Sequence, residues 1–216
     1  MPLDQYLLKN NIKDCKFVCW DTETEGLNLI RSRPWEIAWT VYHGLNKVES
    51  HQHFIKWPDL NVSIGAAKAT GFNPQIIEEK GENPKDVIDL FDSYIYNKEY
   101  KLITANGLGF DAYIHNLARK LVGYKTDYSY IERMYDILPI ARGYRLGIKP
   151  PEEKKDFLAW QYRLLQIFQK GLKCKNSELA KEFGYDVESG QIHSAAFDIE
   201  MTFFSFTNLI KKLDIQ

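Results

Sequence analysis

Two kinds of hydrophobic pattern alternate along this chain. Short runs rich in β-branched and aromatic residues are typical of buried strands, and apolar residues that recur every three or four positions are typical of helices. Strands are expected at Lys16–Trp20, Trp35–Tyr42, Val48–Lys56 and Lys101–Ala105. Helices are expected after Asn73-Pro74 and Asn83-Pro84, at about 110–122, after Pro150-Pro151, from about 177 and at about 194–213. This alternation predicts an α/β domain.

Two of the expected helices show a buried face in the sequence. The helix after Pro150-Pro151 is expected to direct one face to the core, formed by Phe157, Trp160, Leu164, Ile167 and Phe168. The last helix carries the apolar stripe Ile199, Phe203, Phe206, Ile210 and Leu213.

Length and composition fit one domain over residues 1–216. Of its 216 residues, 44% are hydrophobic and 26% are charged, which is ordinary for a globular protein. No apolar run approaches the roughly 18–20 residues that cross a bilayer, and Met1–Asn11 lacks the apolar stretch of a signal peptide. The three cysteines form no CxxC pair and are expected to be reduced. We therefore expect a cytoplasmic protein with no membrane partner.

Charge is unevenly distributed, although the net charge is only −1. Residues 140–175 contain nine Lys or Arg and three Asp or Glu, so this segment carries +6 and the rest of the chain −7. The asymmetry is compatible with a surface that faces phosphates and equally with a solvated helix face. Tyr144, Trp160 and Tyr162 lie in the same segment, and basic with aromatic residues suit single-stranded nucleic acid. Helical spacing alternatively places Trp160 in the core.

The first cluster with candidate chemistry is Asp21 and Glu23, directly after the first expected strand. Residues two apart on a strand project to the same face, so the two carboxylates are expected side by side. Like charges at that separation repel each other unless a cation lies between them, and Mg²⁺ prefers carboxylate oxygens. The alternative is a surface turn with two solvated acids, because acids are common in turns.

Two further clusters lie at the starts of expected helices. Asp111 follows a strand and a glycine-containing loop, in a first helical turn where the helix dipole alone favours an acid. His193 precedes the last helix, and a histidine at such a position is usually structural or solvated. Asp198 lies about one turn into that helix beside the apolar stripe, and ionised Asp is seldom buried without a partner. The structural explanations weaken because all three clusters occur in order on one chain.

In this order the clusters resemble the three motifs of the DEDD exonuclease superfamily, in the branch with a histidine base. The segment Asp21–Leu27 resembles the first motif, Phe110-Asp111 matches the end of the second, and His193 with Asp198 matches the third. The resemblance spans about 17–209. It implies a ribonuclease H-like α/β fold with a mixed five-stranded sheet flanked by helices.

Two parts of the chain depart from the family pattern. Asn106 and Gly107 stand where the second motif usually has His-Asn, which affects the expected geometry near Asp111. Residues of about 142–173 form a longer stretch than in minimal members, and we interpret them as a basic helical elaboration of a single exonuclease domain.

The resemblance implies a metal-dependent 3′→5′ exonuclease that releases 5′-nucleoside monophosphates from single-stranded DNA or RNA. Two Mg²⁺ or Mn²⁺ ions would be held by Asp21, Glu23, Asp111 and Asp198. Asp21 would bridge both ions, Glu23 and Asp198 would complete the site for the ion that binds the attacking water, and Asp111 would serve the second ion. His193 would be the general base, since an imidazole with a pKa near roughly 6.5 accepts a proton at neutral pH.

Substrate-binding residues are expected around the first motif. Thr22, Glu25 and Leu27 are candidates near the 3′ hydroxyl and terminal base, and Phe72 is the candidate wedge. Trp35 is a candidate stacking surface. Core packing is the alternative for both Phe72 and Trp35. A homodimer and an association with a polymerase are both compatible with the resemblance, and the sequence does not choose between them.

Two other functions are compatible with such a fold. One is a non-catalytic module that binds nucleic acid or protein, because a fold does not guarantee a function. The presence of all four acids and the histidine argues against it. The other is an enzyme that cleaves RNA internally in hybrids, and the spacing of His193 and Asp198 argues against that.

Overall fold

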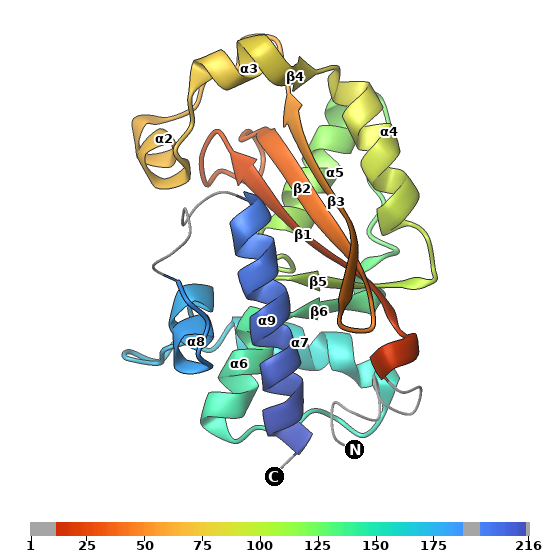
Figure 1. Ribbon diagram of the computed structural model, residues 1–216, viewed down its shortest axis with the longest axis vertical. Coiled ribbons are helices and arrows are strands. Elements are labelled where there is room, and N and C mark those ends of the chain that lie inside the picture. The colour runs from red at the N-terminus through yellow and green to blue at the C-terminus, as the bar shows by residue number, and fades with distance from the viewer. Residues whose placement is uncertain (1–11, 188–194, 215–216) are drawn as a thin grey trace.

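The computed structural model describes residues 12–187 and 195–214. A mixed six-stranded sheet lies at its centre, in the order β4-β3-β2-β1-β5-β6 (Figure 1). Its strands are β1 (Lys16–Thr24), β2 (Pro34–His43), β3 (Asn46–Ile55), β4 (Gly81–Glu82), β5 (Tyr100–Thr104) and β6 (Met134–Asp136). The pairs β1–β2 and β2–β3 are antiparallel, and the pairs β1–β5, β5–β6 and β3–β4 are parallel. The mixed sheet is confirmed, and the two-residue β4 at one edge brings the strands from the expected five to six.

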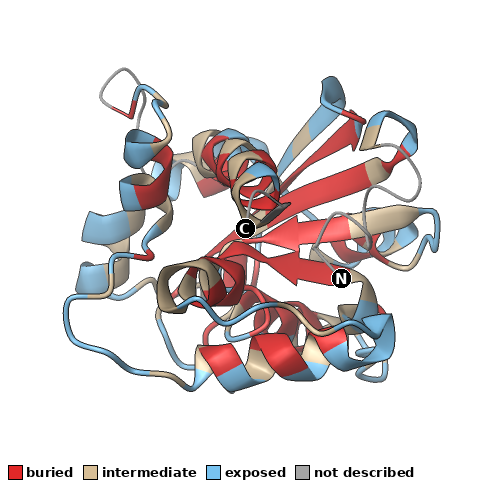
Figure 2. Cartoon of the chain, turned by 90° about the horizontal axis from the view of Figure 1, so that it is seen from below, coloured by how far each residue is buried: buried red, intermediate tan, exposed pale blue. Residues whose placement is uncertain are grey.

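Helices cover both faces of this sheet (Figures 1 and 2). The central strands β1, β2 and β5 are largely buried, whereas β3 is largely exposed. The helices are α2 (Ile64–Thr70), α3 (Pro74–Lys80), α4 (Pro84–Ile95), α5 (Asp111–Leu121), α6 (Ile137–Leu146), α7 (Phe157–Leu165), α8 (Asn176–Glu182) and α9 (Ala195–Asp214). Short 3₁₀ turns are η1 (Ile12–Asp14), η2 (Ile131–Arg133) and η3 (Lys154–Asp156). The core on one face is shared with α4 and α5, and the core on the other with α6 to α9.

The alternation of side chains along β1 decides where its acids lie. Phe17 and Cys19 belong to the core beneath α9, whereas Val18 and Trp20 belong to the core beneath α4 and α5. Because successive side chains of a strand point to opposite faces, the odd-numbered acids Asp21 and Glu23 continue the α9 face. The pairing of β1 with β2 becomes irregular directly after Glu23. The strand therefore delivers both carboxylates to the α9 face just before its regular pairing ends.

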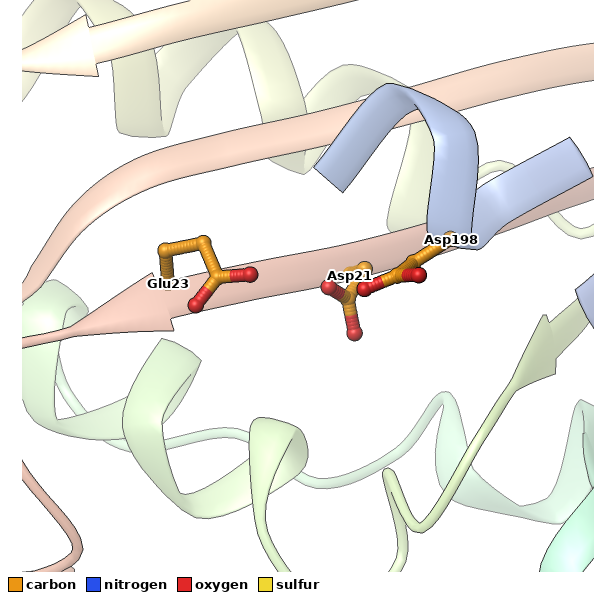
Figure 3. Close-up of side chains that lie close together, drawn as sticks. All are labelled: Asp21, Glu23 and Asp198. Carbon is orange, nitrogen blue, oxygen red and sulfur yellow. The ribbon is translucent and has the colours of Figure 1, made fainter. Parts of the chain in front are cut away.

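Helix α9 packs on the sheet through the stripe that the sequence predicts. Ile199, Phe203, Phe206 and Ile210 are all buried. Each such side chain stabilises the fold by roughly 1.5–3 kcal/mol through removal of apolar surface from water. The stripe orients the helix so that Asp198, one turn from its start, faces the end of β1 (Figure 3).

The expected face of the helix after Pro150-Pro151 is correct in part. Phe157, Trp160 and Leu164 are buried, so Trp160 belongs to the core. Helix α7 ends at Leu165, however, and Phe168 is 93% exposed. The prediction for Phe168 was wrong because the helical period was extended past the end of the helix.

Two helices were not predicted, for different physical reasons. Helix α6 contains Pro139 and Gly143, residues that usually disfavour a helix. Pro139 is tolerated in the first turn, and Gly143 is required because a Cβ there would lie 2.6 Å from the Trp160 ring. Helix α2 has no buried residue, so its sequence lacks the regular spacing of apolar residues that predicts a helix. Within the residues that the structure describes, no helix combines the length and apolar character needed to span a membrane.

Candidate active site

Three carboxylates converge where β1 meets the first turn of α9 (Figure 3). One carboxylate oxygen from each of Asp21, Glu23 and Asp198 lies within 4.8 Å of the other two. Glu23 is 9% exposed, and the two aspartates are partly buried. Carboxylate oxygens grouped at this separation suit a hard divalent cation. The sequence placed Asp21 beside Glu23, and the fold adds Asp198 from the far end of the chain.

The electrostatics of these carboxylates fit a cation site. Burial raises the pKa of Asp21 well above its ordinary value, and neighbouring carboxylates, Asp111 first among them, raise it further. Burial and the charges of Glu36 and Asp198 raise the pKa of Glu23 to about 9. Without a cation, Glu23 therefore holds a proton at neutral pH, and the surroundings of Asp21 disfavour its charged form. A divalent ion would take the place of the Glu23 proton and offset the repulsion between the carboxylates.

Asp111 lies next to this group and is held by the backbone and side chain of β1. Its Oδ1 accepts hydrogen bonds from the Thr22 hydroxyl at 2.5 Å and from the Thr22 N–H at 3.2 Å. Burial raises the pKa of Asp111 to about 6, although the Thr22 hydrogen bonds oppose the shift. Asp111 is not one of the three mutually close carboxylates, but its charge acts on Asp21. Thr22, a predicted substrate contact, thus positions Asp111.

Glu36 is a buried carboxylate of the site that the sequence reasoning did not assign. It lies opposite Glu23 on β2 and is only 3% exposed. Its Oε1 accepts a hydrogen bond from Gln52 Nε2 at 2.8 Å. Burial raises the pKa of Glu36, whereas hydrogen bonds from Gln52 and the backbone N–H of Ala195 oppose that shift. Because Ala195 begins α9, Glu36 ties the start of the Asp198 helix to the sheet. An acid within an otherwise apolar strand was the signal that could have found it.

His193 lies outside the described residues, between α8 and the first residue of α9. Its role as a general base therefore stays a prediction. The described residue Ala195 is two positions further along the chain, and Asp198 follows three residues after it.

The loop after the first motif is held by Glu25. Both Glu25 oxygens bind the Arg33 guanidinium, at 2.7 and 2.9 Å, and they also accept the backbone N–H groups of Arg33 and Asn61. Burial raises the pKa of Glu25, but these hydrogen bonds outweigh it and the net shift is downward. The same loop presents Leu27, which is 88% exposed. The predicted contact of Glu25 with a 3′ hydroxyl stays a prediction, and its observed contacts shape the loop.

A cavity of about 460 Å³ opens beside Glu23, between this loop and α2. Its lining includes Thr24, Leu27, Ala66, Ala69 and Phe110. Helix α2, which forms one wall of this cavity, was not predicted from the sequence, although the sequence contains residues typical of helix caps at both of its ends. The Ser63 hydroxyl accepts the Ala66 N–H at the start of the helix, and Gly71 ends it with φ of 69°.

Phe72 and Trp35 lie outside the lining of this cavity. The Phe72 ring meets the Trp35 ring edge-on, with 5.0 Å between centroids. Trp35 is 2% exposed and packs in the core, so it offers no stacking surface. The wedge role of Phe72, which is partly buried, stays a prediction.

A second, smaller hollow of about 210 Å³ borders the carboxylates next to α8. Asp21, Asp198, Asn176 and Ser177 are among its lining residues. Asn176 is fixed against α9, because its Nδ2 donates to the Thr202 hydroxyl at 2.7 Å and its Oδ1 accepts from the Ser205 hydroxyl at 3.0 Å. The carboxylates therefore lie between two hollows, one walled by α2 and the other by α8.

Comparison with solved structures shows that this is the ribonuclease H-like α/β fold found in exonucleases. Several of the similar structures are of exonuclease I. One shares 21% identity with a TM-score of 0.70 over 93% of this chain. The zinc-bound complex of the Escherichia coli enzyme with single-stranded DNA shares 22%, with a TM-score of 0.69 over 92%. Its complex with a dA16 oligonucleotide shares 22%, with a TM-score of 0.72 over 93%.

The chain spans only 43%, 40% and 42% of the lengths of these three exonuclease I chains. No protein-family model matches the sequence, and no curated protein matches it. At such identities the likeness shows a shared fold, and the activity must be argued from the site.

The crowded carboxylates predict how the stability of the metal-free protein depends on pH. The pKa of Glu23 is about 9 in the fold against an ordinary 4.5, so between these values the folded state holds a proton that the unfolded chain has lost. The free energy of unfolding therefore falls as pH rises through this window. A shift of one pKa unit changes the free energy of unfolding by about 1.4 kcal/mol, and each kcal/mol changes Tm by about 2–4 °C. We therefore expect Tm in EDTA to fall by at least about 5 °C between pH 5.5 and 8.5.

Calorimetry with and without divalent ions checks this expectation. Mg²⁺ or Mn²⁺ should restore Tm at pH 8.5, and Glu23→Gln should reduce the pH dependence because the amide has no proton to lose. A Tm in EDTA that is constant or rises over this window would contradict the raised pKa of Glu23.

Proposed function

We propose that this protein is a metal-dependent 3′→5′ exonuclease. It would hydrolyse the terminal phosphodiester of single-stranded DNA or RNA and release 5′-nucleoside monophosphates. The observation that carries the proposal is the convergence of Asp21, Glu23 and Asp198 within 4.8 Å on an exonuclease-like fold. Residues 1–216 would form one exonuclease domain, with the basic helical elaboration at about 142–173.

The carboxylates fit two Mg²⁺ or Mn²⁺ ions. Asp21 is central in the cluster and would contact both; Glu23 and Asp198 would complete one site, and Asp111 would serve the other. Both Thr22 hydrogen bonds reach Asp111 Oδ1, and Oδ2 would face a cation. When bound, two such ions stabilise the attacking and leaving oxygens of an in-line displacement.

The remaining residues would handle the proton and the terminal nucleotide. His193 would accept the proton of the attacking water, and Glu36 would keep the start of α9 in place while it does so. The cavity of about 460 Å³ beside Glu23 would hold the terminal nucleotide, with Leu27, Ala66 and Phe110 against its base. Exonuclease I is bound to single-stranded DNA in two of the similar structures, which supports this class of substrate.

Digestion of 5′-labelled single-stranded DNA and RNA tests the proposal. With Mg²⁺ or Mn²⁺ we expect a ladder that shortens from the 3′ end, and EDTA should abolish it. A 3′-phosphorothioate-blocked strand is the matched control, because an internal nuclease would still cut it. Absence of cleavage with every metal would overturn the proposal and favour a binding module, whereas internal cuts in the blocked strand would indicate an endonuclease.

A further inference from the structure

The basic segment 140–175 divides into residues that hold the fold and residues that face solvent. Arg142 donates to the Leu164 and Leu165 carbonyls, and Arg145 pairs with Glu182. In the stretch 166–175 between α7 and α8, by contrast, the Lys side chains are exposed: Lys170, Lys173 and Lys175. The charge of this stretch is therefore directed outward.

The same stretch exposes a large aromatic side chain. Phe168 is 93% exposed, the most exposed large hydrophobic side chain among the described residues. Proteins that bind single-stranded nucleic acid combine exposed aromatic rings with basic side chains. The bases stack on the rings, and the phosphates contact the cations. An apolar protein partner would explain the ring but not the lysines around it.

A hollow of about 160 Å³ lies along this stretch. Phe168, Leu172 and Lys175 are among its lining residues. The next residue after Lys175 is Asn176, which lines the hollow that contains Asp21 and Asp198. Consecutive residues of the chain, Lys175 and Asn176, thus line the two hollows. A strand that leaves the carboxylates past α8 would follow a path along this stretch to Phe168.

The order of the hollows gives the path a direction. Helices α2 and α8 lie on either side of the region where β1 ends and α9 begins (Figure 1). A terminal nucleotide beside α2 would leave its scissile phosphate at the carboxylates, and the strand would continue past α8. The part of the substrate that reaches 166–175 is therefore the part 5′ of the scissile bond.

We propose that residues 166–175 bind the single strand 5′ of the scissile bond, with Phe168 stacked on a base and Lys170, Lys173 and Lys175 on phosphates. This inference rests on the proposed exonuclease function. Trp160 is buried, so Phe168 is the aromatic residue of the basic segment on which a base would stack.

Binding measurements test the path without requiring catalysis. We would measure fluorescence anisotropy of 5′-fluorescein-dT12 with the full chain in EDTA. Phe168→Ala should raise Kd about tenfold, since one stacked base is worth about 1–3 kcal/mol. Replacing all three lysines by Ala should lower the slope of log K against log salt by about 2, at about 0.7 per phosphate.

A matched control distinguishes this path from general attraction. The triple variant Lys149→Ala/Lys154→Ala/Lys155→Ala removes the same charge from exposed lysines of the same basic segment, before α7. It should leave Kd and the salt slope nearly unchanged. Equal losses in both triple variants, or no loss with Phe168→Ala and the first triple, would overturn the proposal.

Turnover of short and long substrates provides the second test. In Mg²⁺, the variants of 166–175 should raise KM for dT12 about tenfold and leave turnover of dT3 unchanged, because dT3 is too short to reach Phe168. Equal losses on both lengths would overturn the inference. If no oligonucleotide is hydrolysed while the variants still lose dT12 binding, the path stands and the proposed exonuclease function fails.

Discussion

Replacement of Asp21 by Asn is expected to lower the rate of 3′-end hydrolysis on the order of 10³-fold or more, because stabilisation by the metal site is worth several kcal/mol and each 1.4 kcal/mol is tenfold. A carboxylate oxygen of Asp21 lies within 4.8 Å of oxygens of Glu23 and Asp198, and the negative charge of Asp111 also raises the pKa of Asp21. The amide keeps the shape of the side chain but removes the charge that would bridge two ions. The initial rate of mononucleotide release from labelled dT12 measures the effect.

The fold should tolerate this substitution. Since Asp21 carries a strongly raised pKa, loss of its negative charge relieves repulsion, and Tm in EDTA should be unchanged or higher. Asp86→Asn is the matched control, because it removes an exposed carboxylate from the first turn of α4. It should leave the rate unchanged. An active Asp21→Asn enzyme would exclude the two-ion assignment.

Replacement of His193 by Ala is expected to lower the rate by about 10²–10⁴-fold, which is the usual contribution of a general base. The carboxylates would stay in place, so binding of Mn²⁺ measured by titration calorimetry should change little. The wild-type rate should also fall as pH drops below roughly 6.5, because a protonated imidazole cannot accept a proton. His193→Ala should lose this acidic limb.

His43→Ala is the control for the histidine substitution, since His43 is exposed at the end of β2. It should preserve both the rate and the pH profile. If His193→Ala abolishes Mn²⁺ binding instead, the residue acts on the metal site and the assignment as a base is wrong.

The elements that could be predicted from the sequence are those with a regular spacing of apolar residues or a clear local start signal. The two Asn-Pro helix starts and the buried stripe of α9 were expected where they occur. The first strand was expected at Lys16–Trp20 and begins there, but it continues through Asp21 and Glu23 to Thr24. Helix α2 could not be found this way, because it has no buried residue and lines a cavity instead of packing on a core. Phe168 shows the opposite error, an apparent helical period carried past the end of α7.

The sequence by itself determined that Asp21 and Glu23 share a face, because the two-residue period of a strand is a local property. It also determined that Asp198 lies beside an apolar stripe. The resemblance to the exonuclease motifs assigned Asp198 and Asp21 to one site, but the packing of α9 across β1 is what brings them together. Only the tertiary structure decided that Thr22 holds Asp111 and that Glu36 ties β2 to Ala195. These contacts join residues far apart in the chain, and they depend on strand order and helix packing, which no local pattern encodes.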